Sequence, residues 1–180
     1  VFLPDGRTLA TAGNGGTLRF WDIPSREPLE TIPNLGQVLS MALSPDGTVL
    51  ATGSADNTIR LWDTAQRQDT ARLKGHTSEV RCLAFSADSR NLASADNDGA
   101  VKLWDLELAP PTDSDTLRGH RQVVNDIVFS PDSRHLISTS FKDVPAVRMW
   151  DVSSNRDLSP TLGSPTDNWA TSVDLSADGK

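Results

Sequence analysis

Cysteine, tyrosine and long apolar runs are scarce or absent in this 180-residue sequence. Cys82 is the only cysteine, so no disulfide can form within the chain, and we expect a reducing, cytoplasmic location. It lies in the apolar run VRCLAF, which favours a buried inert thiol over a nucleophile. No apolar stretch approaches the roughly 18 residues of a membrane helix, and no charged-then-apolar leader is visible. We therefore expect no membrane contact and no signal peptide.

Glutamate is also scarce. Of the 24 acidic residues, 20 are Asp and 4 are Glu, and the net charge is −7. Aspartate is the acid of turns, because its short side chain accepts hydrogen bonds from nearby backbone N–H groups. The acid excess therefore indicates turn chemistry more than a basic partner. Since phosphate binding needs a clustered basic surface, which the sequence lacks, we predict no nucleic-acid partner.

What the chain does contain is repetition. Trp-Asp occurs at 21–22, 62–63, 104–105 and 150–151, which gives spacings of 41, 42 and 46 residues. Turn sequences of the type SPDG or SADS begin at residues 3, 44, 86, 130 and 176, and Gly-His occurs at 75–76 and 119–120. Repetition at this period determines the architecture, so it is considered before any local motif.

Each period contains short β-rich runs separated by tight turns, and no segment has a helical period. We predict an all-β fold with innermost strands near 38–43, 80–85, 124–129 and 170–175. Hairpins are predicted near 8–23, 48–63, 90–105 and 134–151, and outer strands near 27–32, 68–73, 115–118 and 158–162. Four antiparallel strands per period correspond to one propeller blade. The blade equivalents are 1–32, 33–73, 74–118 and 119–162, with the start of another at 163–180.

The order Gly-His, Ser-Pro-Asp-Gly, Leu-Ala-Ser/Thr and Trp-Asp resembles the WD40 repeat, and the resemblance covers essentially the whole chain. It implies a WD40 β-propeller segment of about four blades, from a family that usually closes with seven. The regular repeats resemble those of larger bacterial proteins that join propellers to kinase or NTPase signalling domains. We therefore expect a piece of a longer protein, and self-association through open blade edges if the array is truncated.

The resemblance also implies buried hydrogen-bonded sets in which a His, a Ser or Thr, an Asp and the Trp tie loops to strands. The predicted structural sets are His76, Ser94, Asp98 and Trp104; His120, Ser138 (or Thr139), Asp143 and Trp150; and, with Asn34 in place of His, Thr52, Asp56 and Trp62. The blade of Trp21 keeps Thr11 but has Gly15 where the Asp belongs.

A Ser, a His and an Asp also compose a hydrolase triad, which needs an exposed Ser oxygen beside an oxyanion hole. Recurrence of the trio once per blade, with a Trp beside it, favours the structural interpretation. We predict no catalytic residue and a chain that is not an enzyme.

The stretch DNDGAVKLWD raises the possibility of a calcium loop, because Asp96, Asn97 and Asp98 are followed by Gly99. Such a loop needs an oxygen ligand at its fifth position and Gly at its sixth, where Ala100 and Val101 stand. No Cys/His cluster has zinc spacing, and NGGT at 14–17 lacks the Lys of a phosphate-binding loop. We predict no metal and no cofactor.

The remaining candidates lie on one face, where the loops before the inner strands and the hairpin turns open. WD40 proteins commonly bind partners there, through the residue before the hairpin Asp and two residues at the start of the inner strand. Carried over, the candidates are Asn14, Gln37, Leu39, Ala55, Glu79, Arg81, Asn97, Val123, Asn125, Lys142, Trp169 and Thr171. Trp169 is either a binding residue or packed into a neighbouring blade, and the long turn 140–146 either reads a partner or is tolerated length.

These observations predict a non-catalytic scaffold that binds proteins or peptides through this face. The alternative is an enzyme or ligand-binding propeller whose active groups lie in further blades or a fused signalling domain. A subunit of a eukaryotic complex is a third possibility.

Overall fold

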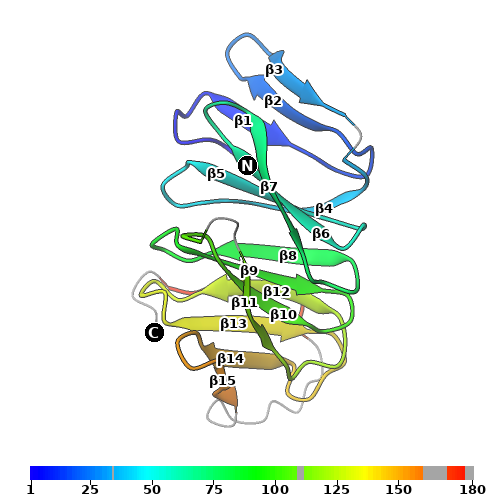
Figure 1. Ribbon diagram of the computed structural model, residues 1–180, viewed down its shortest axis with the longest axis vertical. Helices are drawn as coiled ribbons and strands as arrows, with labels where there is room; N and C mark the ends of the chain where they lie inside the picture. The colour runs from blue at the N-terminus through cyan, green and yellow to red at the C-terminus, as the bar shows by residue number, and fades with distance from the viewer. Residues whose placement is uncertain (34, 109–111, 160–169, 177–180) are drawn as a thin grey trace.

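The computed structural model describes residues 1–33, 35–108, 112–159 and 170–176. Their strands form four antiparallel sheets, which we call blades 1 to 4, and hydrogen-bonded neighbours follow chain order in each. Figure 1 shows the blades stacked along the longest axis of the molecule, with blade 1 in blue and blade 4 in yellow and orange. The described residues contain no helix long and apolar enough to cross a lipid bilayer.

Each described strand belongs to one of these blades. Blade 1 contains β1 (Thr8–Thr11), β2 (Leu18–Asp22) and β3 (Glu27–Ile32), and blade 2 contains β4 (Val38–Leu43), β5 (Val49–Ser54), β6 (Thr58–Asp63) and β7 (Gln68–Lys74). Blade 3 contains β8 (Val80–Phe85), β9 (Asn91–Asp96), β10 (Val101–Asp105) and β11 (Thr112–Leu117). Blade 4 contains β12 (Val124–Phe129), β13 (His135–Ser140), β14 (Val147–Asp151) and β15 (Arg156–Asp157). The all-β fold and three of the predicted innermost strands, β4, β8 and β12, are confirmed.

Three predicted strands differ from the structure. The outer strand expected at 115–118 begins earlier, at Thr112, and the one expected at 158–162 is instead β15, where Asp157 pairs with Trp150. The innermost strand expected at 170–175 is wrong, because residues 170–176 contain no strand. That segment is bound by side chains of β12: Asn125 Nδ2 donates to Ala170 O at 3.0 Å, and Asp126 accepts from the Val173 N–H at 3.0 Å. These side-chain bonds, together with one backbone bond from the Ala170 N–H to Ser140 O at 3.3 Å, hold the segment without a strand ladder.

Three hydrophobic cores lie between successive blades. Trp62 of blade 2 packs in a cluster with Leu18 and Phe20 of blade 1. Trp104 of blade 3 packs against blade 2, and Trp150 of blade 4 packs against blade 3, in two further clusters. All three indoles are 1% exposed. Since removing a buried Trp side chain typically costs about 3–5 kcal/mol, these residues are main contributors to the cohesion between blades.

Trp21 of blade 1 is the exception, because it is only half-buried. Together with Leu9, Ile23 and Arg26 it lines an open, largely apolar hollow of about 550 Å³. No described element covers this hollow in the way that blades 1, 2 and 3 cover the other three indoles. Self-association through open blade edges, as expected from the sequence, stays a prediction.

The turns between the first and second strands explain much of the aspartate excess. In blades 2, 3 and 4 a Ser hydroxyl donates to an Asp two residues later, at 2.6, 2.5 and 2.5 Å, and also accepts a backbone N–H across the turn at 2.9 Å. The Asp residues are Asp46, Asp88 and Asp132. These Ser hydrogen bonds hold the pKa of each carboxyl below its usual value. The acids are therefore bound locally, as the composition indicated.

The hairpin turn of blade 3 contacts the loop that begins blade 4. Gly99 has a φ of +91°, and a Cβ there would lie 2.8 Å from the His120 carbonyl oxygen and 3.0 Å from that of Gln122. Both neighbours are backbone atoms, so they cannot move aside as a flexible side chain can. Only glycine meets the dihedral angle and the close approach together.

We expect Gly99→Ala to lower the free energy of unfolding by about 1–3 kcal/mol, through strain and displacement of the blade 4 loop. The matched control is Gly13→Ala, because a Cβ at Gly13 meets no atom within 4 Å and its φ is not in the left-handed region. Urea unfolding of the two variants measures the difference. Equal effects would show that the contact between the blade 3 turn and the blade 4 loop is unimportant for stability.

Candidate functional site

The blade topology places two kinds of loop at the same end of the strands: those before the inner strands and the hairpin turns between the second and third strands. A backbone hydrogen bond joins the two loops in each of blades 2, 3 and 4. The Ala55 N–H donates to Gln37 O at 2.9 Å, and the Asn97 N–H donates to Glu79 O at 3.0 Å. In blade 4 the Phe141 N–H donates to Val123 O at 3.1 Å. Turn and inner-strand candidates are therefore neighbours on one face.

The inner strands carry a repeated irregularity at this end. The register of β4 with β5, β8 with β9 and β12 with β13 shifts by one residue at the second position of each inner strand. The extra residues are Leu39, Arg81 and Asn125. A β-bulge leaves its extra residue unpaired in the ladder and redirects the side chain. All three residues belong to the predicted partner-binding set, although the sequence did not reveal the bulges.

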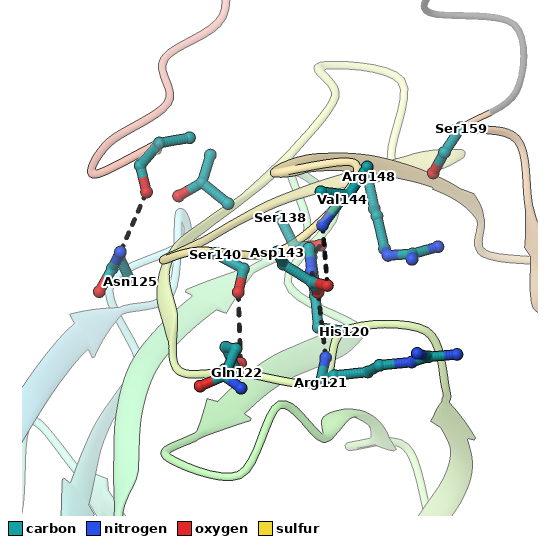
Figure 2. Close-up of polar contacts among 12 residues, drawn as sticks. His120, Arg121, Gln122, Asn125, Ser138, Ser140, Asp143, Val144, Arg148 and Ser159 are labelled. Carbon is teal, nitrogen blue, oxygen red and sulfur yellow. Dashed lines mark hydrogen bonds and ion pairs between the residues drawn. The ribbon is translucent and has the colours of Figure 1, made fainter. Parts of the chain in front are cut away.

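Blade 4 contains the buried hydrogen-bonded set expected from the resemblance. His120 Nδ1 lies 2.9 Å from Asp143 Oδ2, and His120 Nε2 lies 2.8 Å from Ser138 Oγ. The Trp150 indole N–H donates to the same Ser138 hydroxyl at 2.8 Å. Figure 2 shows His120, Ser138 and Asp143 converging next to the loop that carries Arg121 and Gln122. The set ties the loop before β12 to the second and third strands.

The protonation states in this set follow from burial. Burial lowers the pKa of His120 below its usual value, and this effect outweighs the opposing hydrogen bond to Asp143. Burial raises the pKa of Asp143, but hydrogen bonds from His120, Arg121 and Val144 hold the net value below normal. His120 is therefore neutral near pH 7, with Nδ1–H donating to the Asp143 carboxylate and Nε2 accepting from Ser138.

Blade 3 contains the same kind of set, but with a different aspartate from the one predicted. His76 Nδ1 lies 2.7 Å from Asp96 Oδ2, His76 Nε2 lies 2.6 Å from Ser94 Oγ, and the Trp104 N–H donates to Ser94 at 2.8 Å. The assignment of Asp98 is wrong, because its side chain is exposed. Asp96 ends strand β9 with its carboxylate fully buried, and it also accepts the backbone N–H groups of Asp98 and Ala100.

Blades 1 and 2 keep only the Trp end of the set among the described residues. The Trp62 N–H donates to Thr52 Oγ1 at 3.0 Å, and the Trp21 N–H donates to Thr11 Oγ1 at 2.9 Å. Asp56 does not join Thr52 and Trp62, which corrects its predicted role. Its carboxylate accepts from the Thr58 hydroxyl at 2.6 Å and pairs with Arg72 at 2.5 Å on the outer strand. The chain has Asn34 instead of a His in this blade, and Asn34 lies outside the described residues.

The environment of these groups bears on catalysis. Ser94 and Ser138 are 0% exposed, so neither hydroxyl can reach a substrate in this conformation. The Cys82 thiol is buried, and burial raises its pKa to about 12, so it is not a thiolate nucleophile at neutral pH. In the described ranges, no three His, Cys, Asp or Glu side chains are grouped so that they could hold a metal ion.

The predicted partner-binding residues occupy varied surroundings. Asn14 accepts a hydrogen bond from Gln37 at 3.1 Å, and the Glu79 carboxylate lies 3.9 Å from the Arg81 guanidinium. Lys142 and Thr171 are exposed. Five further candidates are half-buried: Leu39, Ala55, Asn97, Val123 and Asn125. Trp169 lies outside the described residues.

The sequence candidates did not include three residues beside Lys142. Arg121, Gln122 and Arg148 line a cleft of about 360 Å³ at the loop face of blade 4, together with Gly119, Lys142, Asp143 and Val144. Arg121 and Gln122 directly follow Gly119-His120, so the cationic sequence RGHRQ was a signal for the first of them. Arg148 comes from β14, and only the fold brings it to the cleft.

Comparisons with known proteins agree with this architecture. The family model described as "WD domain, G-beta repeat" matches residues 1–22, 26–63, 67–105 and 112–143. The solved structures entitled "Structure of U3-55K" and "Crystal structure of RRP9 WD40 repeats" are both similar to this chain, with TM-scores of 0.77 and 27% sequence identity. Each match covers 88% of this chain but only 49% and 48% of those chains, respectively, so this chain spans about half their length. No curated protein matched the sequence.

The two aspartates of blade 3 can be separated by mutation. We expect Asp96→Ala to lower the free energy of unfolding by about 1–3 kcal/mol, because it leaves His76 and two backbone N–H groups without their acceptor. Asp98→Ala, two residues away, is the control and leaves the unfolding curve unchanged. Thermal and urea unfolding of both variants provide the measurement. A larger effect of Asp98→Ala would restore the assignment based on the sequence.

The neutral state of His120 predicts a pH dependence. Its pKa is lower in the folded state than the usual 6.5 or so of an unfolded chain, so the unfolded state binds the proton more readily. The stability it contributes is complete above pH 6.5 or so and is lost as the pH falls below that value. Urea unfolding between about pH 7.5 and 5.5 measures this slope. His120→Asn flattens the slope, whereas the control His135→Asn keeps it; equal slopes in both variants would refute the neutral assignment.

Proposed function

Because this chain belongs to the WD40-repeat family, whose propellers generally serve as interaction scaffolds, we propose that it binds proteins or peptides without catalysing a reaction. The binding face is the one formed by the loops before the inner strands and by the hairpin turns. The β-bulges at Leu39, Arg81 and Asn125 are the observation that carries this proposal. They release one side chain per blade from the ladder, at the same end of three successive blades.

The hydrogen-bonded loops support the same proposal. Each bulge lies beside a hairpin turn that is joined by a backbone hydrogen bond to the residue before the inner strand. In blades 3 and 4 the buried His, Ser and Asp hold these loops from beneath. A partner that binds a preformed surface pays little conformational entropy for ordering it. The buried hydrogen bonds inside the blades thus fix the positions of the surface loops, as expected for a binding scaffold.

Further parts of the proposal rest on the sequence. We propose a cytoplasmic location, supported by the single cysteine, Cys82, which is free and buried. Protein or peptide partners are favoured over nucleic acid by the net charge of −7. The chain spans about half the length of the solved structures that it matches. We therefore also propose, and do not infer from those structures, that the partners of the whole protein are proteins or peptides.

Site-specific photo-crosslinking tests the choice of face. A photoreactive amino acid is placed at Arg81 or Lys142 on the proposed face, and at Arg90 or Arg134, which lie in the turns at the opposite ends of the strands. We expect discrete crosslinked species from the first pair of positions in cells that produce the protein, and none from the second pair. Equal or stronger crosslinking from Arg90 and Arg134, or none from any position, would contradict the proposal.

A further inference from the structure

The cleft at the loop face of blade 4 differs in charge from the rest of the chain. Three of the charged residues that line it are cations, Arg121, Lys142 and Arg148, and one is an acid, Asp143. The chain as a whole has a net charge of −7. A local cationic surface on an acidic protein attracts anionic groups to one place, because the surrounding surface repels them. We call this site the basic cleft.

The acid of the basic cleft is bound inside the blade. Asp143 is only 5% exposed, and both carboxylate oxygens are already bound. Oδ2 accepts from the Arg121 N–H at 3.0 Å and lies 2.9 Å from His120 Nδ1, while Oδ1 accepts from the Val144 N–H at 2.9 Å. Its charge is directed into the blade. The exposed cations at the mouth are Arg121 and Lys142.

Arg148 forms a fixed wall of the basic cleft. Its side chain is 13% exposed, its Nη1 pairs with Asp157 of β15, and its guanidinium carbon lies 6.0 Å from the Trp150 ring centroid. A Cβ on Gly119 would lie 2.9 Å from Arg148 Nη1 and 2.8 Å from a carbon of Trp150. The absence of a side chain at Gly119 therefore makes room for the guanidinium. Arg148 positions the cleft, whereas Arg121 and Lys142 face a ligand.

The two sides of the basic cleft are held at a set separation. Ser140 Oγ donates to Gln122 O at 3.3 Å, and the Phe141 N–H donates to Val123 O at 3.1 Å, as Figure 2 shows for the first of these bonds. Lys142 lies in the turn with a φ of +57°, and its Nζ lies 5.1 Å from the Phe141 ring centroid. The loop that carries Arg121 and the turn that carries Lys142 are thus joined before any ligand arrives, which lowers the cost of ordering their backbones on binding.

We infer that the basic cleft binds a carboxylate-rich segment of a protein partner. The planar guanidinium of Arg121 matches a carboxylate with paired N–H donors, and the Lys142 ammonium supplies a second positive charge beside it. Val144 lies at the rim and is 62% exposed, so an apolar residue next to the acids would gain a contact. Nucleic acid fits less well, since tracking a phosphate backbone takes a longer cationic surface and exposed aromatic rings for the bases.

This inference deepens the proposed function, because it assigns a partner chemistry to one part of the proposed face. It can be tested without the natural partner. The probe is a fluorescein-labelled short peptide rich in Glu and Asp with one Leu, measured by fluorescence anisotropy against the purified chain. The comparison peptide has Gln and Asn in place of the acids. Inorganic phosphate and a single-stranded oligonucleotide serve as competitors.

The key variant is Arg121→Gln/Lys142→Gln, which removes two exposed charges from the basic cleft. Its matched control is Arg90→Gln/Arg134→Gln, which changes the net charge equally in turns at the opposite ends of the strands. We expect the acidic peptide to bind wild type and the control alike, and at least about tenfold more weakly to the cleft variant. Binding also weakens as salt is added, since exposed charges are screened. Unchanged circular dichroism and melting confirm that the variants are folded.

Several results would overturn the inference. These are no binding of the acidic peptide to wild type, equal loss in the cleft variant and the control, equal binding of the Gln/Asn peptide, and tighter binding of the oligonucleotide at the same site. If any of these results is found while Arg81 and Lys142 still crosslink a partner, only the assignment of the basic cleft is lost. If the peptide binds as expected but crosslinking comes only from Arg90 and Arg134, the cleft chemistry stands and the proposed face is wrong.

Discussion

The buried tryptophans of the third strands are the constraint on which the rest of the structure depends. Each of Trp62, Trp104 and Trp150 fills the space between its own blade and the preceding one, so its indole N–H cannot reach water. A buried donor without an acceptor costs about 1–3 kcal/mol, and a Ser or Thr on the second strand supplies the acceptor in every blade. The hydroxyl in turn needs an acceptor for its own proton. In blades 3 and 4 a His Nε2 atom lies within hydrogen-bond distance of that hydroxyl, and an Asp carboxylate lies beside the His Nδ1 atom.

The hydrogen bonds that link Trp, Ser, His and Asp connect the inside of blades 3 and 4 to their surface loops. The His stands in the loop before the inner strand, and the Asp stands at or beyond the end of the second strand. Bonds that satisfy the Trp therefore also hold the loops that form the proposed binding face. The side chains exposed on those loops do not belong to the buried sets, and they differ between blades. Blade 3 presents the Glu79–Arg81 pair, and blade 4 presents Arg121 and Lys142.

Features that repeat along the chain can be predicted from the sequence, whereas those in which one blade departs from the pattern cannot. The inner strands, the Ser-Asp turns and the buried set of blade 4 follow from recurring short motifs. Asp98 stands as far before Trp104 as Asp56 stands before Trp62, so spacing along the chain favours Asp98 as the partner of His76. Spacing along the chain cannot show that Asp96 ends β9 with its carboxylate beside His76 while Asp98 lies in solvent. The bulges at Leu39, Arg81 and Asn125 are also invisible in sequence, since a bulge is a property of two paired strands.

By itself the sequence determined the family, the four-blade array, the complete buried set of blade 4 and the Trp with its Ser or Thr partner in the other blades, because each depends on local spacing and on burying apolar surface. The tertiary structure alone decided which aspartate binds His76, which residues are released by bulges, and that Arg148 joins Arg121 and Lys142 at one cleft. These outcomes depend on distances between strands and loops of different segments. Such distances follow from how the blades pack, and no pattern within a single repeat encodes them.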